Sequence, residues 1–395
     1  MLDFVSNDAL PVLADEQESD DEVGKGAVDV GGDEDFEAPR TTDALVVGHG
    51  AFYSRLMPQP FPQLPPGQRG EVRWLRHDSK ILAGNHWRDP TERDVIVYTP
   101  PNWEGDPVPA VMCLIGFSGT GEKLLNRGMN TVSIANRIDR LIADGCPPFA
   151  AVLPDCMTTL GGSQYLDSIG IGNYATYVAQ ELRNFVSNEL GVGVRWGVMG
   201  HSSGGFGALH LAMNHPGAFA AAACHAGDMG FDLCYIGDLG KAVRGVAKSG
   251  GLEGFLNEFW ASNNPGGAAF AAINVLAMAA AYSPNPTASP FPADLPVDFE
   301  TGEVDFGVLQ SWSRFDPIHQ VGEPAKAAAL RALDLLYIDV GNRDEYNLHY
   351  GARRFVKKLD LAQIEHVYEE FPGGHGGSRH RFNRSLRLLA DALTR

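Results

Sequence analysis

Residues 195–215 read RWGVMGHSSGGFGALHLAMNH and hold the strongest local signal in the chain. The segment opens with a short apolar run typical of a buried strand and continues in a pattern typical of a helix. Between the two lies Gly200-His201-Ser202-Ser203-Gly204, a G-x-S-x-G motif on a predicted strand-to-helix turn. Such a turn lifts the serine hydroxyl clear of the sheet, and side chains at Gly200 or Gly204 would collide with neighbouring strand or helix. The motif therefore predicts Ser202 as a nucleophile.

The rest of the chain repeats this strand-then-helix rhythm. Short apolar runs that end in Gly-, Asp- or Pro-bearing loops predict strands within 71–79, 93–100, 110–117, 149–155, 195–200, 218–227, 335–342 and 366–374. Helical patterns occupy 130–144, 174–190, 205–215, 325–333 and 383–393. Strands that alternate with helices indicate an α/β fold with a mostly parallel sheet flanked by helices. In such sheets, active sites lie at the carboxyl ends of the strands.

Composition divides the 395 residues into a tail, a linker and a body. Residues 1–40 hold 13 Asp/Glu and 2 Lys/Arg, too acidic to bury a core, so we expect a disordered tail. Residues 41–70 are expected to form a Pro-rich linker, and residues 71–395 the catalytic domain. Residues 229–315 contain no strong strand and are too long for a plain loop. We expect them to form an inserted, partly helical cap that contributes to substrate selection.

Charge and cysteine usage exclude several classes of protein. The formal net charge is −18 and no basic cluster occurs, which argues against nucleic-acid or membrane partners. Five scattered cysteines without CxxC spacing predict neither disulfides nor a metal site, and we expect no cofactor. The N-terminus lacks a signal-peptide pattern, and the longest apolar run, residues 268–282, is too short to span a bilayer. We therefore expect a cytoplasmic protein, with its oligomeric state left open.

A serine hydroxyl needs a base to become a nucleophile. His375 lies in FPGGHGG, a Gly-rich loop directly after the last predicted strand and before the terminal helix. A loop of this kind allows an imidazole to reach back to Ser202. His375 is therefore the predicted base, and His380 is the alternative.

The base in turn needs a carboxylate to orient it. Asp344 lies in the loop beyond the penultimate strand, whereas its rival Asp339 lies within that strand, where structural hydrogen bonds are more common. Glu345 is a second rival. The order Ser202, Asp344, His375 is the order of α/β-hydrolases and differs from the orders of chymotrypsin and subtilisin.

Attack on a carbonyl also requires two N–H donors for the oxyanion. The backbone N–H of Ser203 is one candidate, because it lies at the start of the helix that follows the elbow. The second is expected from the loop after the strand AVMCLI, which reads Gly116-Phe117-Ser118-Gly119-Thr120-Gly121. The Phe117 N–H is the first choice and the Ser118 N–H the second. This loop lacks the spacing and the lysine of a phosphate-binding loop.

Seven segments together resemble a known family. They are RDVIVYTPPNW (93–103), AVMCLIGFSG (110–119), AAVLPD (150–155), GNYATYVAQEL (172–182), GHSSGG (200–205), IDVGNRDEYNLH (338–349) and YEEFPGGHGGSRHRF (368–382). In this order they resemble the esterase D-like branch of the α/β-hydrolase superfamily over residues 71–395. That branch includes feruloyl esterases, S-formylglutathione hydrolases, enterochelin-type esterases and mycolyltransferases of the antigen 85 type. The resemblance implies the same three residues, Ser202, Asp344 and His375.

The resemblance also implies that a strand-end Pro154-Asp155 leads into a loop near the acyl site, here with Gln164 and Tyr165. We expect Asp155 itself to be structural.

The implied activity is serine carboxylic-ester hydrolysis through an acyl-enzyme on a small ester. A feruloyl or aryl ester is the first choice, since aromatic residues of the insert could line a pocket (Phe255, Phe259, Trp260, Phe270 and Tyr282). They could equally fill the core of the cap. An S-formylglutathione-type thioesterase and an acyltransferase are the alternatives on the same three residues. A non-catalytic binding protein is disfavoured, because no member of the set is missing.

Overall fold

The computed structural model describes residues 63–128, 131–262 and 267–395. The expected acidic tail, residues 1–40, and residues 41–62 of the expected linker lie outside this description. The described end of the linker carries one short 3-10 turn, η1 (Pro66–Gln68), before the first strand begins at Glu71.

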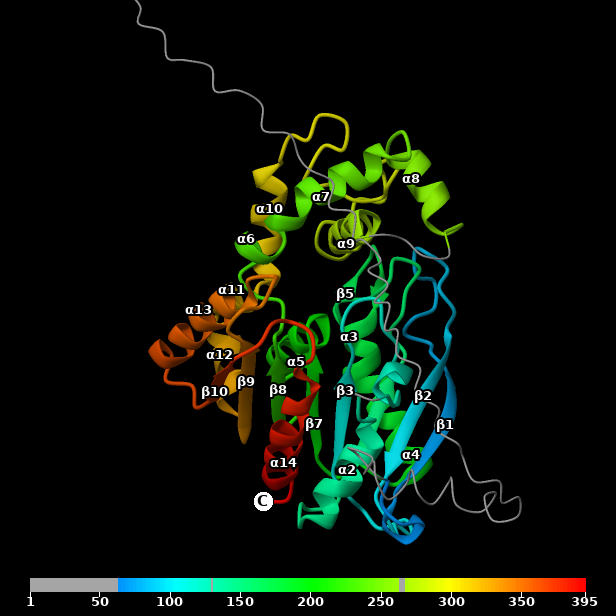
Figure 1. The fold of residues 1–395 in the computed structure, drawn as a ribbon, viewed down its shortest axis with the longest axis vertical. Helices are drawn as coiled ribbons and strands as arrows, with labels where there is room; N and C mark the ends of the chain where they lie inside the picture. The colour runs from blue at the N-terminus through cyan, green and yellow to red at the C-terminus, as the bar shows by residue number, and fades with distance from the viewer. Residues whose placement is uncertain (1–62, 129–130, 263–266) are drawn as a thin grey trace, which may run out of the picture. The chain divides into compact units, whose positions relative to one another are not determined.

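An eight-stranded sheet forms the centre of the molecule (Figure 1). Its strands, in the spatial order β1-β2-β4-β3-β7-β8-β9-β10, are β1 (Glu71–Asp78), β2 (Glu92–Thr99), β4 (Ala150–Pro154), β3 (Ala110–Leu114), β7 (Trp196–His201), β8 (Ala221–His225), β9 (Leu335–Gly341) and β10 (Val367–Phe371). The six strands from β4 to β10 run parallel, whereas β2 pairs antiparallel with both of its neighbours. The predicted α/β-hydrolase fold with a mostly parallel sheet is thereby confirmed, and all eight predicted strands are present.

Helices cover both faces of this sheet (Figure 1). On one face, α2 (Ile134–Ala143) and α14 (Phe382–Leu393) share a buried apolar cluster with alternate residues of the strands. The other face is covered by a larger set, which comprises α3 (Tyr174–Thr176), η3 (Tyr177–Leu182), α4 (Arg183–Leu190), α5 (Ser203–Asn214), α12 (Pro324–Arg331) and α13 (Leu348–Leu361). Because both faces are buried, the inner strands are apolar on both sides, and this explains their unbroken apolar runs.

Two of the predicted helices differ from expectation, one in its first residue and one in the type of its middle section. The helix expected from residue 130 begins at Ile134, because Ser133 Oγ accepts a hydrogen bond from the Asn136 backbone N–H at 3.2 Å and caps it. The helix expected over 174–190 is present, but its middle section, η3, is π-helical. It ends at Gly191, whose φ of 70° is the left-handed conformation that favours glycine.

Residues 229–315 form a helical layer above the carboxyl ends of the strands (Figure 1). The helices are α6 (Phe231–Cys234), α7 (Ile236–Ala247), α8 (Leu252–Phe259), α9 (Gly267–Tyr282) and α10 (Phe306–Trp312), and no described residue between them belongs to a strand. We refer to residues 229–315 as the cap. The Ala-rich α9 is buried from Ala271 onward apart from Asn274, and α7 packs closely on it. At Gly245 of α7 a Cβ atom would lie 2.3 Å from the Ala268 carbonyl oxygen, so this approach requires glycine.

The chain then returns to the sheet through η4 (Ser313–Phe315) and α11 (Pro317–Gln320). Four short elements complete the described residues: η2 (Gly121–Leu124), the paired strands β5 (Asp167–Ser168) and β6 (Gly172–Asn173), and η5 (Ser378–Arg381). Among the described helices, none combines the length and the apolar character needed to cross a bilayer.

Candidate active site

Ser202 lies on the turn between β7 and α5 in a strained backbone conformation. Its φ is 60° and its ψ is −128°, a region that residues with a side chain rarely adopt. Two hydrogen bonds hold the turn: the Ser202 N–H donates to the His225 carbonyl at 3.0 Å, and the Ser202 carbonyl accepts from the Phe206 N–H at 3.0 Å. The strain is therefore imposed by the surrounding sheet and helix.

The two glycines of the motif are required by close backbone contacts. A Cβ atom at Gly200 would lie 2.2 Å from the Gly204 carbonyl oxygen, and one at Gly204 would lie 2.7 Å from the Leu114 carbonyl oxygen of β3. No side chain fits at either position, so the predicted reason for the glycine spacing agrees with the packing.

A chain of hydrogen bonds joins Ser202, His375 and Asp344. His375 Nε2 lies 3.0 Å from Ser202 Oγ, and His375 Nδ1 lies 2.8 Å from Asp344 Oδ2. The Asp344 side chain is fully buried, and its other oxygen accepts the Tyr346 backbone N–H at 2.9 Å. The three residues singled out from the sequence are thus brought together at the carboxyl edge of the sheet.

The alternatives to these residues have other contacts. Glu345 is exposed and accepts the backbone N–H of His375 at 2.6 Å, a bond that lowers the pKa of the Glu345 carboxyl. Glu345 therefore holds the loop of His375 and does not touch its ring. The His380 ring contacts the Gly377 carbonyl and the Phe371 ring, away from Ser202.

His201 contacts His375 in a way that the sequence did not indicate. The two rings lie 4.6 Å apart between centroids, and His201 Nε2 lies 3.0 Å from the His375 carbonyl oxygen. Burial lowers the pKa of His201 to about 3, so the ring is neutral near pH 7 and its Nε2–H can donate to that carbonyl. These contacts hold the loop and ring of His375, the base that Ser202 needs.

The predicted oxyanion donors lie beside Ser202. Phe117 and Ser203 line the same cavity as Ser202, and within the described residues neither backbone N–H has a hydrogen-bond acceptor. The alternative donor is occupied, because the Ser118 N–H donates to the Gly161 carbonyl at 2.7 Å. Tyr165 holds this loop in place through its hydroxyl, which donates to the Ile115 carbonyl at 2.6 Å.

The cavity that contains Ser202 has a volume of about 220 Å³. Its lining comes partly from the sheet edge and partly from the cap, and comprises Gly116, Phe117, His201, Ser202, Ser203, Asp228, Cys234, Tyr235, Asp238, Phe270, Asn274, Tyr346, Leu348 and His375. Of the five aromatic residues considered for such a pocket, only Phe270 lines it. The side chains of Phe255 and Tyr282 are buried, and Trp260 is partly exposed and donates to the Thr159 carbonyl at 3.0 Å.

Asp228 is the functional candidate that the sequence analysis missed. It is buried in the loop that follows β8. Its Oδ2 accepts hydrogen bonds from Ser203 Oγ, Gln164 Nε2 and the Tyr235 hydroxyl at 3.1–3.2 Å. Burial raises the pKa of this carboxyl. Its place after a parallel strand was a usable signal, because such strand ends meet at the active edge. Asp155, by contrast, binds Arg93 and the Met157 N–H and does not line the cavity.

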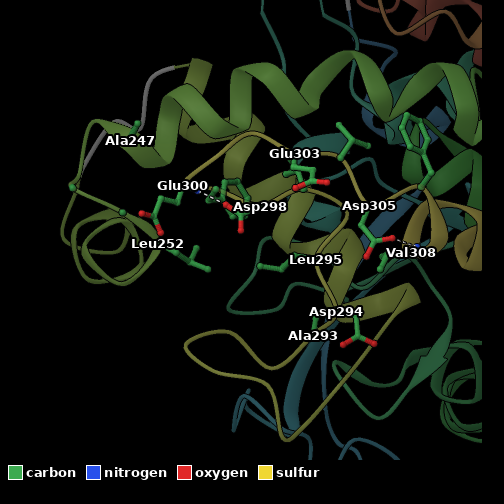
Figure 2. Close-up of a pocket in the computed structure, with 16 residues that line it drawn as sticks. Ala247, Leu252, Ala293, Asp294, Leu295, Asp298, Glu300, Glu303, Asp305 and Val308 are labelled. Atoms are coloured by element: carbon green, nitrogen blue, oxygen red, sulfur yellow. Dashed lines mark hydrogen bonds between the residues drawn. The ribbon is translucent and has the colours of Figure 1, made fainter.

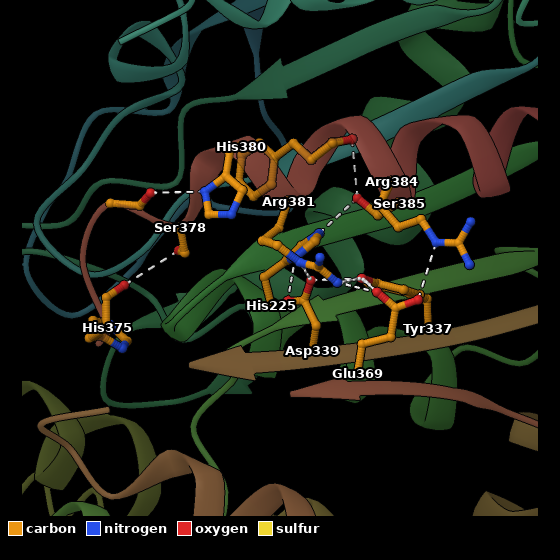
Figure 3. Close-up of polar contacts among 12 residues, drawn as sticks. His225, Tyr337, Asp339, Glu369, His375, Ser378, His380, Arg381, Arg384 and Ser385 are labelled. Atoms are coloured by element: carbon orange, nitrogen blue, oxygen red, sulfur yellow. Dashed lines mark hydrogen bonds and ion pairs between the residues drawn. The ribbon is translucent and has the colours of Figure 1, made fainter. Parts of the chain in front are cut away.

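A second Ser–His–Asp set lies inside the protein (Figure 3). His225 Nδ1 lies 2.7 Å from Asp339 Oδ1, and His225 Nε2 lies 2.8 Å from Ser385 Oγ. All three residues are at most 1% exposed. Asp339 also pairs with Arg381 at 3.1 Å and accepts from the Tyr337 hydroxyl at 2.8 Å. We refer to Ser385, His225 and Asp339 as the buried set.

The buried set connects the segments that carry Ser202, Asp344 and His375. The His225 carbonyl accepts a hydrogen bond from the Ser202 backbone N–H. Asp339 lies on β9, the strand that leads to Asp344. Arg381, which binds Asp339, ends the η5 turn that follows the His375 loop. Arg381 and Arg384 further bind Glu369 on β10 (Figure 3).

The cap also contains an acidic groove away from Ser202 (Figure 2). Its volume is about 1250 Å³, and its acidic residues are Asp294, Asp298, Glu300, Glu303 and Asp305. None of its lining residues lines the cavity of Ser202. Within the described residues, no group of three or more His, Cys, Asp or Glu side chains could hold a metal ion.

Comparison with known proteins places the chain among esterases. The family model described as "Putative esterase" matches residues 89–387. Solved structures with a similar fold include a ferulic acid esterase (15% identity, TM-score 0.50, covering 82% of this chain and 99% of that one). An S-formylglutathione hydrolase from Agrobacterium tumefaciens is similar at 17% identity (TM-score 0.52, 84% and 98%). The fluorophosphonate-binding serine hydrolase F of Staphylococcus aureus is similar at 16% (TM-score 0.52, 82% and 99%).

Proposed function

The chain belongs to the Esterase family and is a carboxylic ester hydrolase, and we propose that Ser202 is its nucleophile in an acyl-enzyme mechanism. The observation that carries this proposal is the hydrogen-bond chain from Ser202 Oγ through His375 to Asp344, with steps of 3.0 and 2.8 Å, beside a cavity. Each element of serine catalysis then has a residue in place.

In the first half-reaction, His375 Nε2 accepts the proton of Ser202 as Oγ attacks the ester carbonyl carbon. The negative charge that develops on the carbonyl oxygen is stabilised by the Phe117 and Ser203 N–H groups. Asp344 accepts the Nδ1–H of His375 and so keeps Nε2 available as the base. The C–O bond to the alcohol then breaks, and the leaving oxygen takes its proton from His375.

In the second half-reaction, water replaces the alcohol. His375 removes a proton from the water as its oxygen attacks the acyl carbon, and the bond to Ser202 Oγ breaks with return of the proton to the serine. The acid leaves and the enzyme is restored. Transfer to a second alcohol would use the same steps, so the identity of the acceptor is what separates a hydrolase from a transferase.

The cavity supports a small ester as the substrate. Its volume of about 220 Å³ holds a compact acyl or alcohol group, and Phe117, Phe270, Tyr235 and Tyr346 supply aromatic surface for an aryl group. The described residues contribute no lysine or arginine to the lining. Glutathione carries two carboxylates and one ammonium, so its net charge is negative, and a lining with two carboxylates supports S-formylglutathione less well than an ester without negative charge.

A panel of p-nitrophenyl esters, from acetate to decanoate and with ferulate esters, tests the proposal on the wild type and on Ser202→Ala. A fluorophosphonate probe with a mass-shift readout reports the nucleophile independently of the ester chosen. We expect turnover and one adduct in the wild type, with both absent in the variant. An adduct that persists in Ser202→Ala would overturn the assignment.

A further inference from the structure

The cavity beside Ser202 is lined by two acidic side chains. Among the described residues, the charged side chains that line it, apart from the histidines His201 and His375, are the carboxylates Asp228 and Asp238. The two carboxylates differ in their partners. Asp238 is paired with the exposed Lys241 at 3.0 Å, whereas the structure gives Asp228 no cationic side-chain partner among the described residues.

Asp228 is held by neutral donors that all bind the same oxygen. Ser203 Oγ, Gln164 Nε2 and the Tyr235 hydroxyl donate to Oδ2, and no described group donates to Oδ1. A carboxylate oxygen can accept more than one hydrogen bond, so Oδ1 is an unused acceptor on a residue that lines the cavity. Ser203 follows the nucleophile directly, which places this acceptor close to the reaction centre.

A second unused acceptor lies behind the first. Gln164 is 2% exposed, and its Oε1 is buried with no hydrogen-bond partner among the described residues. The orientation of its amide is defined, because Nε2 is the atom that faces Asp228 Oδ2 at 3.1 Å. Gln164 lines a small pocket next to the main cavity, which shares Gly116, Phe117 and Ser203 with it. That pocket has a volume of about 10 Å³, too small for a ligand group, so the contribution of Gln164 is to hold Asp228 Oδ2 in place.

Aromatic rings complete a surface that suits a cation. Phe117 and Phe270 meet edge to face with 5.7 Å between centroids, and Tyr235 and Tyr346 line the same cavity. Aromatic faces attract ammonium groups, and a desolvated carboxylate attracts them more strongly. A bound cation would also favour the ionised form of Asp228, which burial alone disfavours.

We propose that the preferred substrate is an ester that carries a protonated amine near its scissile carbonyl, with Asp228 as the residue that binds the ammonium. The inference rests on the proposed function, since it assigns the substrate class of the same site. Asp228 Oδ1 accepts an N–H of the ammonium, and the aromatic rings pack around its carbon substituents. A neutral ester leaves Oδ1 unpaired, and an anionic ester is repelled by both carboxylates.

Two pairs of esters that differ only by N–H⁺ in place of C–H test the proposal. On the alcohol side, 2-(dimethylamino)ethyl butanoate is compared with 3-methylbutyl butanoate. On the acyl side, methyl 3-(dimethylamino)propanoate is compared with methyl 4-methylpentanoate. The readout is the ratio of kcat/KM within each pair at pH 7, for the wild type and for Asp228→Asn.

In the wild type we expect the cationic ester to be favoured by about tenfold or more in at least one pair, as for a charge-assisted hydrogen bond. In Asp228→Asn we expect that ratio to fall to about threefold or less, because the amide keeps the size but not the charge. Asp232→Asn is the matched control: it removes an exposed carboxylate of the cap that binds Arg354 and does not line the cavity, so the ratio should keep its wild-type value.

A purely structural role for Asp228 would lower both rates and leave the ratio unchanged, which would overturn the inference. A wild-type ratio of one or less in both pairs would overturn it without any variant, even if Asp228→Asn does not fold. Fluorophosphonate labelling separates the two proposals. A labelled wild type that shows no cation preference, or that turns over neither pair, contradicts only the substrate class. A wild type without label and without turnover contradicts the serine mechanism as well.

Discussion

The protein contains two Ser–His–Asp sets with nearly the same hydrogen-bond lengths and very different surroundings. In the set of Ser202, the two hydrogen bonds measure 3.0 and 2.8 Å; in the buried set, they measure 2.8 and 2.7 Å. By these distances alone, the buried set would be the better catalytic triad. The hydrogen-bond geometry of three side chains is therefore not what distinguishes a catalytic site.

Access and backbone conformation do distinguish the two sets. Ser202 lines a cavity, sits on a strained turn and has two unpaired N–H groups beside it. Ser385 lies within the regular helix α14 and is 0% exposed. Because Ser385 is buried, an ester carbonyl cannot reach its hydroxyl.

The charge on the acid also differs between the sets. Asp339 shares its charge between His225 and Arg381, whereas Asp344 has no cationic partner besides His375 in the described part of the chain. An aspartate that is already neutralised by arginine has less capacity to stabilise an imidazolium. The buried set is thus suited to stability and the set of Ser202 to proton transfer.

The two serines provide the largest contrast. We expect Ser202→Ala to lower kcat by about 10⁶-fold, as for removal of a triad nucleophile, with little change in Tm. Ester turnover and thermal melting of the same preparation measure both effects. If Ser202→Ala retained more than a few per cent of wild-type turnover, the distinction drawn between the two sets would be wrong.

The two acids give the next contrast in activity. Asp344→Asn should lower kcat by about 10⁴-fold, because the amide favours the wrong tautomer of His375 while leaving the fold intact. Single-turnover kinetics with an activated ester, which isolates the acylation step, is the appropriate measurement. An Asp344→Asn enzyme within tenfold of wild type would point to Glu345 as the acid in use.

Asp339→Asn should instead act on stability. The change removes a buried charge that accepts hydrogen bonds from Arg381 and Tyr337, and we expect it to cost about 1.5–3 kcal/mol in the free energy of unfolding, because Arg381 is part-exposed and keeps Glu369 as a partner. Denaturant unfolding measures this cost.

The pH dependence of that cost follows from the pKa of Asp339. Burial alone would raise this pKa, but the contacts with His225, Tyr337 and Arg381 lower it below its ordinary value. The stabilisation is therefore complete above the ordinary carboxyl pKa of about 3.9 and is lost as the pH falls through the lower folded value. The gap in Tm between wild type and Asp339→Asn should narrow on acidification below about pH 4; a gap that widened would contradict the lowered pKa.

Ser385→Ala is expected to have the smallest effect. It leaves His225 Nε2 without its partner, at a cost of about 1–3 kcal/mol in the free energy of unfolding. Turnover per folded molecule should stay within about threefold of wild type, since Ser385 lies outside the cavity. Loss of activity beyond the loss of folded protein would mean that the buried set takes part in the chemistry.

The fold and the three residues at its edge could be predicted because each follows from local pattern. Ser202 lies in a G-x-S-x-G motif between a predicted strand and a predicted helix, and His375 and Asp344 follow predicted strand ends. These patterns can be recognised in the sequence without any knowledge of tertiary packing. The fold prediction is confirmed, and the roles of the three residues stay predictions that the variants above address.

The contacts that define the pocket could not be predicted in the same way. Asp228 meets Gln164, 64 positions earlier, and His201 meets His375, 174 positions later. The local sequence places Asp228 after a strand and His201 at the end of one, but it does not reveal which distant side chains they contact. Likewise Phe270 lines the cavity while Phe255 packs inside the cap, although both are aromatic residues of the same insert. Which of them faces the cavity depends on how the cap sits on the sheet.

The buried set fastens the segments of Ser202, Asp344 and His375 to the sheet, while Tyr235, Asp238, Phe270 and Asn274 reach the cavity from the cap. The residues that hold the catalytic set thus lie in the sheet and its loops, whereas the cap supplies part of the cavity wall next to Asp228 and Phe117. We expect substitutions at the cap positions that line the cavity to alter ester preference while Ser202, Asp344 and His375 keep their contacts. The same division predicts that random mutagenesis will yield altered preference from cap positions and mostly loss of folded protein from Asp339 and its neighbours.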